Sequence, residues 1–344
     1  MRILIVRLGA LGDIVHALPV ASALRHAFPD ARIDWVVDER HREMLDLVPV
    51  IDRRVVFRSQ SVPAWRGAVE VVRELRRGGY DVAIDVQGLV KSAFLARASR
   101  AGRVIGFPTA RLRERAARLF YTETHDPGPT KHVIEKNLGL VAPLGVASPV
   151  GHDMRFPIEA RPSTAPAIVR RQLGLGERAG FALMNPGAAW PNKRWPPERL
   201  GAVALWLHRH HALPSAVLWG PGDEPLAAEV VSASAGAAHL APRTSLADLV
   251  ALARAAALMV SGDTGPLHLT AAVGTPVVGI YGPTHEVRNG PWSSDDLTVS
   301  RFGQCECHHR RRCHARRWCI GDVSVSEVIG AVDRRISAFS APHV

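Results

Sequence analysis

Short apolar runs alternate with stretches of helical periodicity, and this alternation constrains the fold more than any other feature of the chain. Residues 2–7 (RILIVR) form an apolar run that ends at glycines, and apolar residues then recur at helical spacing from Ile14 to Arg25. The next predicted strands are residues 32–37, 54–57 and 81–86, and the helix between the last two is 65–77. This pattern predicts a parallel, doubly wound sheet and therefore an α/β fold.

A segment rich in proline and small residues, from Pro143 to Pro166, interrupts the alternation, which then resumes. The second set of predicted strands is 181–185, 215–220, 257–262 and 276–281, and the predicted helices are 197–210, 226–233, 246–255 and 266–272. We therefore expect two tandem Rossmann-like domains with a central cleft. The N-terminal domain is expected at 1–150, the linker at 151–165 and the C-terminal domain at 166–344, with its last helix free to pack back on the N-terminal domain.

Composition limits the class of protein and its partners. The chain has 344 residues, of which 47% are hydrophobic, enough to bury two cores. Its formal net charge of +11 favours an acidic partner, such as nucleic acid, an anionic membrane surface or a phosphorylated substrate. Arg7, Asp13 and His16 interrupt the N-terminal apolar region, unlike a secretory signal, and no run of about 18 apolar residues occurs. We expect a cytoplasmic protein that touches a membrane through charge.

Three loops that follow predicted strands have unusual chemistry. They read GALGD after the first strand, PGAAWPNKRWP after Asn185, and GDTGPLH after Ser261. Ligands of open α/β sheets bind beyond the carboxyl ends of the strands, so these loops are the place to look for a site. No G-x-G-x-x-G follows a strand and no P-loop lysine pattern occurs, which argues against a dinucleotide dehydrogenase or an ATPase.

Each candidate side chain in these loops has a functional and a structural interpretation. Asp13 can accept a proton from a substrate hydroxyl as a general base, or cap the helix that begins at Ile14. Lys193 can bind a diphosphate, or be an ordinary solvated cation. Glu224 can accept hydrogen bonds from ribose hydroxyls, or complement a helix dipole from the first turn.

The stretch GDTGPLHL predicts a helix start suited to an anion. Pro266 fits the first turn, Asp263 or Thr264 its cap, and His268 falls within reach of the same turn. Unpaired helix N–H groups and His268 can meet a phosphate, whereas the Asp263 carboxylate would repel it. Asp263 therefore either caps the helix or holds hydroxyl groups beside the phosphate. A sugar linked to a diphosphate combines both kinds of group in one ligand.

Taken together, these loops resemble glycosyltransferase family 9, the bacterial heptosyltransferases of lipopolysaccharide core assembly. The resemblance extends over nearly the whole chain, through MRILIVRLGALGDIVHALP, WVVDE, DVQGLVKSA, LFY, KRWP, GDTGPLHLTAA and YGPT. DVQGLVKSA and the stretch from Trp35 to Glu39 look most like the heptosyltransferase I branch of the family.

The resemblance implies a GT-B fold and an inverting transfer of heptose from ADP-heptose to the Kdo sugar of Kdo-lipid A, with no metal or other cofactor required. It implies Asp13 as the catalytic base, Lys193 as the diphosphate contact and Glu224 as the ribose contact. The remaining implied donor-loop residues are Asp263, Thr264, Gly265 and His268, with Ala188 and Ala189 where relatives carry hydroxyl residues and Thr244 where an apolar residue often meets the adenine. The implied acceptor contacts are Gly12, Gln87 and Lys91.

The implied acceptor also accounts for the basic charge better than nucleic acid does. Seven arginines and one glutamate lie between Arg97 and Arg118, and Kdo carboxylates and lipid A phosphates are dense anions. We therefore expect ADP-heptose, Kdo-lipid A and the anionic surface of the inner membrane as partners, a peripheral location on that membrane, and no nucleic acid.

Two alternatives remain open. One is heptosyltransferase II, or another family 9 transferase with a different acceptor. The other is a metal-containing nucleic-acid-binding protein, suggested by the net charge and by a cluster of cysteines with interleaved histidines. Its members are Cys305, Cys307, Cys313 and Cys319, with His308, His309 and His314. The spacing C-x-C-x5-C-x5-C lacks the C-x2-C pairs of common zinc modules, so we favour free thiols packed beside the C-terminal helix over a metal site.

Overall fold

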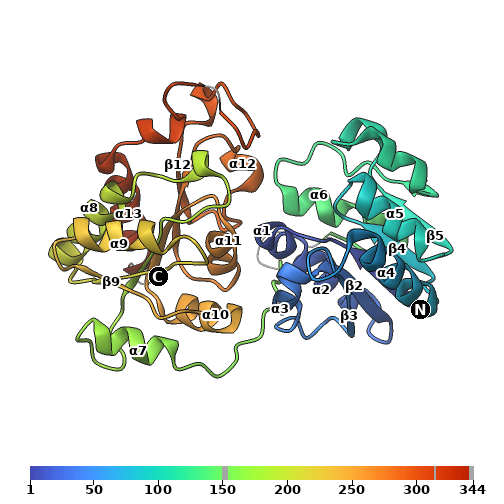
Figure 1. The fold of residues 1–344 in the computed structure, drawn as a ribbon, viewed down its shortest axis with the longest axis horizontal. Coiled ribbons are helices and arrows are strands. Elements are labelled where there is room, and N and C mark those ends of the chain that lie inside the picture. Colours follow the sequence, from blue (N-terminus) through green and yellow to red (C-terminus); the bar gives the residue numbers. More distant parts are fainter. Residues whose placement is uncertain (149–153, 314, 341–344) are drawn as a thin grey trace. The chain divides into compact units, whose positions relative to one another are not determined.

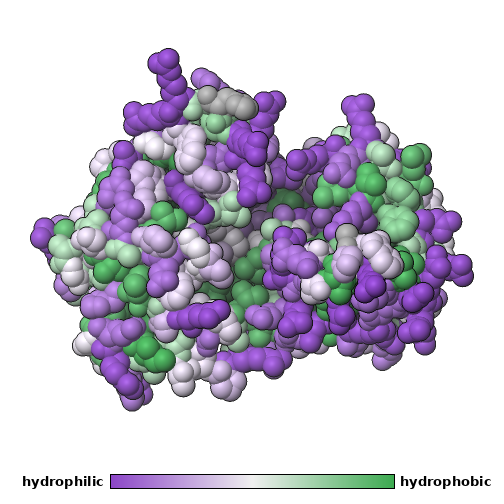
Figure 2. Space-filling model, in the orientation of Figure 1, coloured by the Kyte–Doolittle hydropathy of each residue, from purple (hydrophilic) through white to green (hydrophobic). Residues whose placement is uncertain are grey.

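The computed structural model describes residues 1–148, 154–313 and 315–340 (Figure 1). The chain divides into two compact units, Met1–Glu159 and Ala160–Val344. Residues 154–164 form neither helix nor strand. Positions 151–153 of the expected linker lie outside the described residues. Figure 2 shows hydrophilic side chains over much of the visible face of each unit, with smaller hydrophobic areas between them.

The first unit contains a six-stranded parallel sheet with the order β3-β2-β1-β4-β5-β6. Its strands are β1 (Arg2–Val6), β2 (Arg32–Asp38), β3 (Arg53–Phe57), β4 (Val82–Asp85), β5 (Arg103–Gly106) and β6 (Glu123–Thr124). The central pairings place Ile3 beside Ile33 and Val82, so the predicted parallel sheet is confirmed. Neither β5 nor the edge strand β6 was predicted from the sequence, because they are only four and two residues long.

The helices of this unit are α1 (Leu11–Val15), α2 (Leu18–Ala27), α3 (Arg42–Leu45), α4 (Ala64–Gly78), α5 (Val90–Ala98) and α6 (Val133–Gly139). The predicted helix at 65–77 is confirmed by α4. The prediction of one helix from Ile14 to Arg25 is wrong, because the chain breaks between α1 and α2. Pro19 lacks an N–H and fits the first turn of a helix, so a new helix begins at Leu18.

The second unit contains a second six-stranded parallel sheet, with the order β12-β11-β10-β7-β8-β9. Its strands are β7 (Ala182–Asn185), β8 (Ser215–Val217), β9 (Ala238–Leu240), β10 (Leu258–Gly262), β11 (Val277–Tyr281) and β12 (Leu297–Ser300). Counted within its own unit, each sheet has the strand order 3-2-1-4-5-6. This is the order of a Rossmann sheet, whose ligands bind where the direction of winding reverses, beyond the carboxyl ends of the central strands.

The helices of the second unit are α7 (Ala165–Gln172), α8 (Pro197–His211), α9 (Glu224–Ala233), α10 (Leu246–Ala255), α11 (Gly265–Ala272), α12 (Glu286–Asn289) and α13 (Val325–Ser340). The four helices predicted for the second unit are confirmed by α8, α9, α10 and α11, whereas α7 and α12 were not predicted. The long C-terminal helix α13 packs against α8, β11 and β12 of its own unit.

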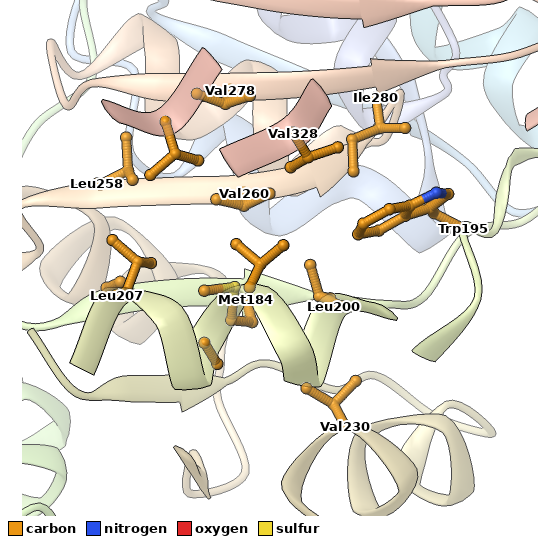
Figure 3. Packing of buried hydrophobic residues seen from close by; sticks show 14 of the residues in the cluster. Met184, Trp195, Leu200, Leu207, Val230, Leu258, Val260, Val278, Ile280 and Val328 are labelled. Atoms are coloured by element: carbon orange, nitrogen blue, oxygen red, sulfur yellow. The ribbon is translucent and has the colours of Figure 1, made fainter. Parts of the chain in front are cut away.

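The core of the second unit joins the sheet to α8, α9 and α13. Figure 3 shows Val328 of α13 among Val260, Val278 and Ile280 of the sheet, with Trp195 at the end of the row. The Trp195 side chain is buried, and its indole Nε1 donates to the carbonyl oxygen of Val323 at 3.1 Å. Burying large apolar side chains of this kind is the main source of stability, and here it also fixes the loop that precedes α8.

Candidate active site

The short helix α1, which follows β1, holds Asp13 against a buried arginine. Arg7 Nη2 lies 2.7 Å from Asp13 Oδ1, and Asp13 Oδ2 accepts the backbone N–H of Ala10 at 3.1 Å. Arg7 Nη1 also donates to the carbonyl oxygen of Val86 at 3.0 Å, which ties the guanidinium to the end of β4. The Asp13 side chain remains 41% exposed, so a substrate can reach it. The sequence predicted the carboxylate but not the cation that orients it.

A fully buried carboxylate, Asp85, fixes the DVQGLVKSA loop at the end of β4. It accepts hydrogen bonds from the backbone N–H groups of Gln87 and Gly88 and from the hydroxyls of Ser92 and Tyr121, at 2.7–3.1 Å. Burial raises the pKa of Asp85, while these bonds oppose the shift. The neighbouring Gln87 Oε1 accepts the N–H of Leu8 at 2.8 Å. Gln87 therefore joins two loops at the carboxyl edge of the sheet.

Two further predicted acceptor residues lie at the same edge. Lys91, in the first turn of α5, places Nζ 3.9 Å from the centre of the Phe57 ring, and partial burial lowers its pKa. Gly12 is buried in α1, directly before Asp13. The Asp13–Arg7 pair follows β1, and Lys91 follows β4 and lies against Phe57 at the end of β3.

In the second unit, Asp263 lies between two basic side chains. Its Oδ2 is 2.5 Å from Lys193 Nζ, and its Oδ1 is 2.8 Å from His268 Nε2. Burial would raise the pKa of Asp263, but hydrogen bonding to His268 and the charge of Lys193 hold it far below its usual range. The carboxylate is therefore ionised and can only accept, so His268 Nε2 must carry the proton of their hydrogen bond.

Local packing brings Lys193 to Asp263 across a separation of 70 residues. A Cβ on Gly262, at the end of β10, would stand 2.6 Å from the carbonyl oxygen of Lys193, so only glycine permits this close approach. Two residues after Lys193 in the same loop, the Trp195 side chain is buried in the core of the second unit. The Lys193 ammonium also lies 4.7 Å from the centre of the Trp190 ring, which further limits its position.

Asn185, at the end of β7, ties the loop after β7 to the loop after β10. Its Nδ2 lies 2.9 Å from Ser261 Oγ, 3.2 Å from Thr264 Oγ1 and 3.1 Å from the carbonyl oxygen of Gly187. Thr264 occupies the N-cap position of α11, but its side chain accepts no hydrogen bond from the helix. The N–H groups of the first turn of α11, beginning at Gly265, are therefore left without a side-chain cap.

The other predicted donor residues lie at neighbouring strand ends. Glu224 is exposed in the first turn of α9, and Thr244 is half-buried before α10. Ala188 is buried and Ala189 exposed in the loop after β7. Within the described part of the chain, no hydrogen bond or ion pair joins Glu224 or Thr244 to Asp263. A bound ligand would have to bridge these groups.

The cysteines form two thiol pairs. Burial and a hydrogen bond with Cys307 raise the pKa of Cys313, and burial with a hydrogen bond to Cys305 raises that of Cys319 to about 12. All four cysteines are free thiols. Across residues 1–148, 154–313 and 315–340, no group of three or more His, Cys, Asp or Glu side chains is arranged to hold a metal ion. His314 lies outside the described residues.

Sequence reasoning missed two residues that shape the site, Arg7 and Asn185. Arg7 directly follows the apolar strand β1, and a charge next to a buried strand requires a partner, which is a usable signal. Asn185 is also the last residue of its strand. Its partners Ser261 and Thr264 are 76 and 79 residues away, so only the fold identifies them.

Comparison with known proteins identifies the family. The model of glycosyltransferase family 9 (heptosyltransferase) matches residues 68–319. Lipopolysaccharide heptosyltransferase 1 of Escherichia coli O18:K1:H7 (strain RS218 / NMEC) is 30% identical over 318 residues, covering 88% of this chain and 92% of the relative.

Solved structures agree with this assignment. A glycosyltransferase family 9 protein from Veillonella parvula DSM 2008 has a TM-score of 0.82 at 23% identity, over 98% of this chain and 97% of that one. The E. coli heptosyltransferase WaaC with ADP has a TM-score of 0.77 at 25% identity, over 97% of this chain and 100% of that one.

The predicted fold class is confirmed, since these heptosyltransferase structures share the GT-B fold of two Rossmann-like sheets. None of the described helices has the length and apolar character needed to cross a membrane. The family match favours an enzyme over the nucleic-acid-binding alternative. The chain belongs to glycosyltransferase family 9 (heptosyltransferase) and is a glycosyltransferase.

Proposed function

We propose that the chain transfers L-glycero-D-manno-heptose from ADP-heptose to the Kdo sugar of Kdo-lipid A during synthesis of the lipopolysaccharide inner core, with inversion at the anomeric carbon. The observation that carries this proposal is the buried Asp263 carboxylate, which holds Lys193 and His268 beside the uncapped first turn of α11. A basic side chain, a histidine and free helix N–H groups in one place suit the diphosphate of a nucleotide sugar.

In this proposal, Lys193 and the backbone N–H groups of Thr264, Gly265 and Leu267 bind the donor diphosphate, and His268 holds the Asp263 carboxylate beside them. Lys193 has three ammonium hydrogens and gives one to Asp263, so two remain for phosphate oxygens. Asp263 has lone pairs left after its two bonds and accepts from hydroxyls of the heptose. Glu224 binds the ribose, while Ala188, Ala189 and Thr244 lie around the rest of the nucleotide.

At the acceptor, Asp13 removes the proton from the attacking Kdo hydroxyl. Arg7 fixes one carboxylate oxygen and the Ala10 N–H the other, so the base is oriented before substrate binds. Gly12, Gln87 and Lys91 contact the acceptor. Attack on the anomeric carbon from the face opposite ADP inverts its configuration.

Charge development explains why these groups are placed as they are. Negative charge grows on the diphosphate as the glycosidic bond breaks, and Lys193 with the α11 amides stabilises it, so the proposal requires no metal ion. The acceptor is a membrane lipid, and the proposed location is therefore the cytoplasmic surface of the inner membrane, with no role for nucleic acid.

The decisive assay follows ADP release when the protein is mixed with ADP-heptose and Kdo-lipid A. Turnover with this pair is expected. Turnover only on an already heptosylated core would support the alternative of heptosyltransferase II or another acceptor. No ADP release with any Kdo-containing acceptor would reject the proposal.

The role of Asp13 is tested by Asp13→Asn and Arg7→Met. Loss of a general base is expected to lower kcat by about a hundredfold or more in Asp13→Asn. Arg7→Met should lower kcat because the carboxylate loses its orientation, and combining both substitutions should cost little more than Asp13→Asn alone, since both act on one group. Strictly additive losses, or full activity of Asp13→Asn, would contradict the assignment.

A further inference from the structure

The exposed apolar side chains of the first unit are concentrated on one layer of its sheet. Apart from Met1, they are Trp65 and Val69 on α4, Phe94 on α5 and Leu119 in the 3-10 helix Arg115–Phe120. Leu119 is 83% exposed, Trp65 65% and Phe94 45%. In the described part of the opposite layer, α2 and α6 carry no exposed large apolar side chain. Solvent-facing apolar groups gathered in this way indicate an interaction surface.

Helix α5 joins three elements of this layer. Helix α5 packs against α4 and against the 3-10 helix Arg115–Phe120, and the rings of Phe94 and Phe120 meet edge to face at 6.0 Å. Figure 2 shows hydrophobic areas bordered by hydrophilic side chains where Figure 1 labels α5. We call the outer side of α4, α5 and residues 115–120 the α4–α5 surface.

Arginines continue the same helix faces beyond the apolar residues. Trp65, Val69 and Arg73 follow one another at intervals of four on α4, and Phe94 and Arg97 are three apart on α5. Other exposed arginines of this layer are Arg66, Arg76, Arg77, Arg100, Arg113 and Arg115.

The acidic side chains among these arginines are already engaged. Glu70 lies 3.7 Å from Arg58, Glu74 pairs with Arg53, and Glu114 accepts the N–H of Val90 at 2.8 Å. Glu114 keeps its negative charge, but the exposed arginines outnumber it, so the charge left on the α4–α5 surface is positive and surrounds apolar groups. This combination is complementary to a bilayer that contains anionic lipids, where basic residues meet headgroups and apolar side chains enter the interface.

The apolar end of the surface lies beside the proposed acceptor site. Helices α4 and α5 begin at the carboxyl ends of β3 and β4, and Lys91 lies one turn before Phe94. A lipid-linked acceptor stays in the bilayer, so the edge of the sheet that receives its sugar must approach the headgroups. Trp65 and Phe94 lie near this edge, whereas Arg73 and Arg76 lie further along α4.

We propose that the α4–α5 surface docks the protein on a bilayer rich in anionic lipids, with Trp65, Phe94 and Leu119 entering the interface and the surrounding arginines meeting the headgroups. This inference rests on the proposed use of a lipid acceptor. It adds the surface, the orientation and the class of lipid that recognises it.

The test is co-sedimentation of the full chain with vesicles of phosphatidylcholine alone or with about one third phosphatidylglycerol. Binding is expected only with phosphatidylglycerol present. The double variant Phe94→Glu/Leu119→Glu should bind on the order of tenfold more weakly. Arg73→Gln and Arg97→Gln should each weaken binding about fivefold at low salt. Ile168→Glu, at a 36% exposed apolar residue of α7, is the matched control and should bind like the wild type.

Three results would overturn the proposal. They are failure of the wild-type chain to bind phosphatidylglycerol vesicles, equal weakening by Ile168→Glu, and unchanged binding by the double variant. Light scattering gives the oligomeric state of the wild type and of the double variant. If the wild type is a dimer, the double variant is a monomer and vesicle binding persists, the surface is an interface between copies of the chain instead.

Activity on a deacylated, water-soluble Kdo acceptor distinguishes this proposal from the proposed function. The double variant should release ADP from that acceptor at the wild-type rate, since no membrane is needed. If the wild type itself shows no turnover, the proposed function fails, whereas vesicle binding is measured without any substrate.

Discussion

Asp263 has both carboxylate oxygens engaged by basic side chains, and this arrangement makes its ionisation part of the stability of the second unit. Its pKa in the folded chain lies far below that of an exposed aspartate, which is near 4. Because the pKa of Asp263 is lower in the folded chain than in the unfolded chain, its carboxylate stabilises the fold above about pH 4. This stabilisation is lost as the pH falls below that value. Between about pH 5 and 8 the contribution is constant.

We therefore expect Asp263→Asn to lower the free energy of unfolding by about 2 kcal/mol at pH 7, because Lys193 loses its buried counter-charge. The difference from the wild type should shrink when urea unfolding is repeated near pH 3.5. Asp295→Asn, at an exposed aspartate of the same unit, is the control and should change stability little at either pH. A difference for Asp263→Asn that grows on acidification would contradict the assignment.

The chemical type of these residues could be predicted from the sequence, but their partners could not. The strand-end position of Asp263, Lys193 and Asp13 identified them as candidates. That Asp263 pairs with Lys193 rather than capping α11 follows from the fold, because Gly262 and Trp195 together bring the two loops into contact. The same holds for Arg7 and Asp13, which only the turn after β1 makes neighbours.

At the level of elements, the segment from Lys193 to α8 is held by one buried indole. Trp195→Ala should destabilise the second unit by about 3 kcal/mol, since it leaves a cavity beside Leu200 and Val328. It should also raise KM for ADP-heptose, because Lys193 loses its fixed position. Thermal unfolding and donor kinetics check both effects.

Trp195→Phe is the matched control, since it keeps most of the apolar volume and loses only the hydrogen bond to Val323. It should cost about 1 kcal/mol and leave KM nearly unchanged. If Trp195→Ala and Trp195→Phe raise KM for ADP-heptose equally, packing of the indole does not explain the position of Lys193.

Central elements could be predicted better than edge elements. β1, β2, β7, β10 and β11 are apolar runs buried on both faces, which gives a strong signal. The strands β6, β9 and β12 are edge strands, and β5 lies next to an edge strand. All four are two to four residues long and less apolar, so their pairing depends on the strand already in place. The break between α1 and α2 was missed because apolar spacing continues across it.

The whole molecule consists of two compact units, each with its own sheet and core, and we expect two steps in calorimetric unfolding.

ADP at about 100 times its Kd should stabilise the unit that binds it by about 2.7 kcal/mol. For a unit of this size the corresponding transition should rise by about 5 °C or more. Lys193→Ala should remove most of this rise. Equal shifts of both transitions would contradict donor binding by the second unit alone.

The position of α13 in the chain has a consequence for how the protein is made. Val328, Ala331 and Val332 of this last described helix complete the core that also contains Trp195 and Val260. Chains fold as they leave the ribosome, and domains generally fold as units. The first unit can therefore fold while the second unit still waits for α13, so the nascent second unit exposes an unfilled apolar groove until α13 has left the ribosome. Chaperones that bind such grooves would protect the second unit during that interval.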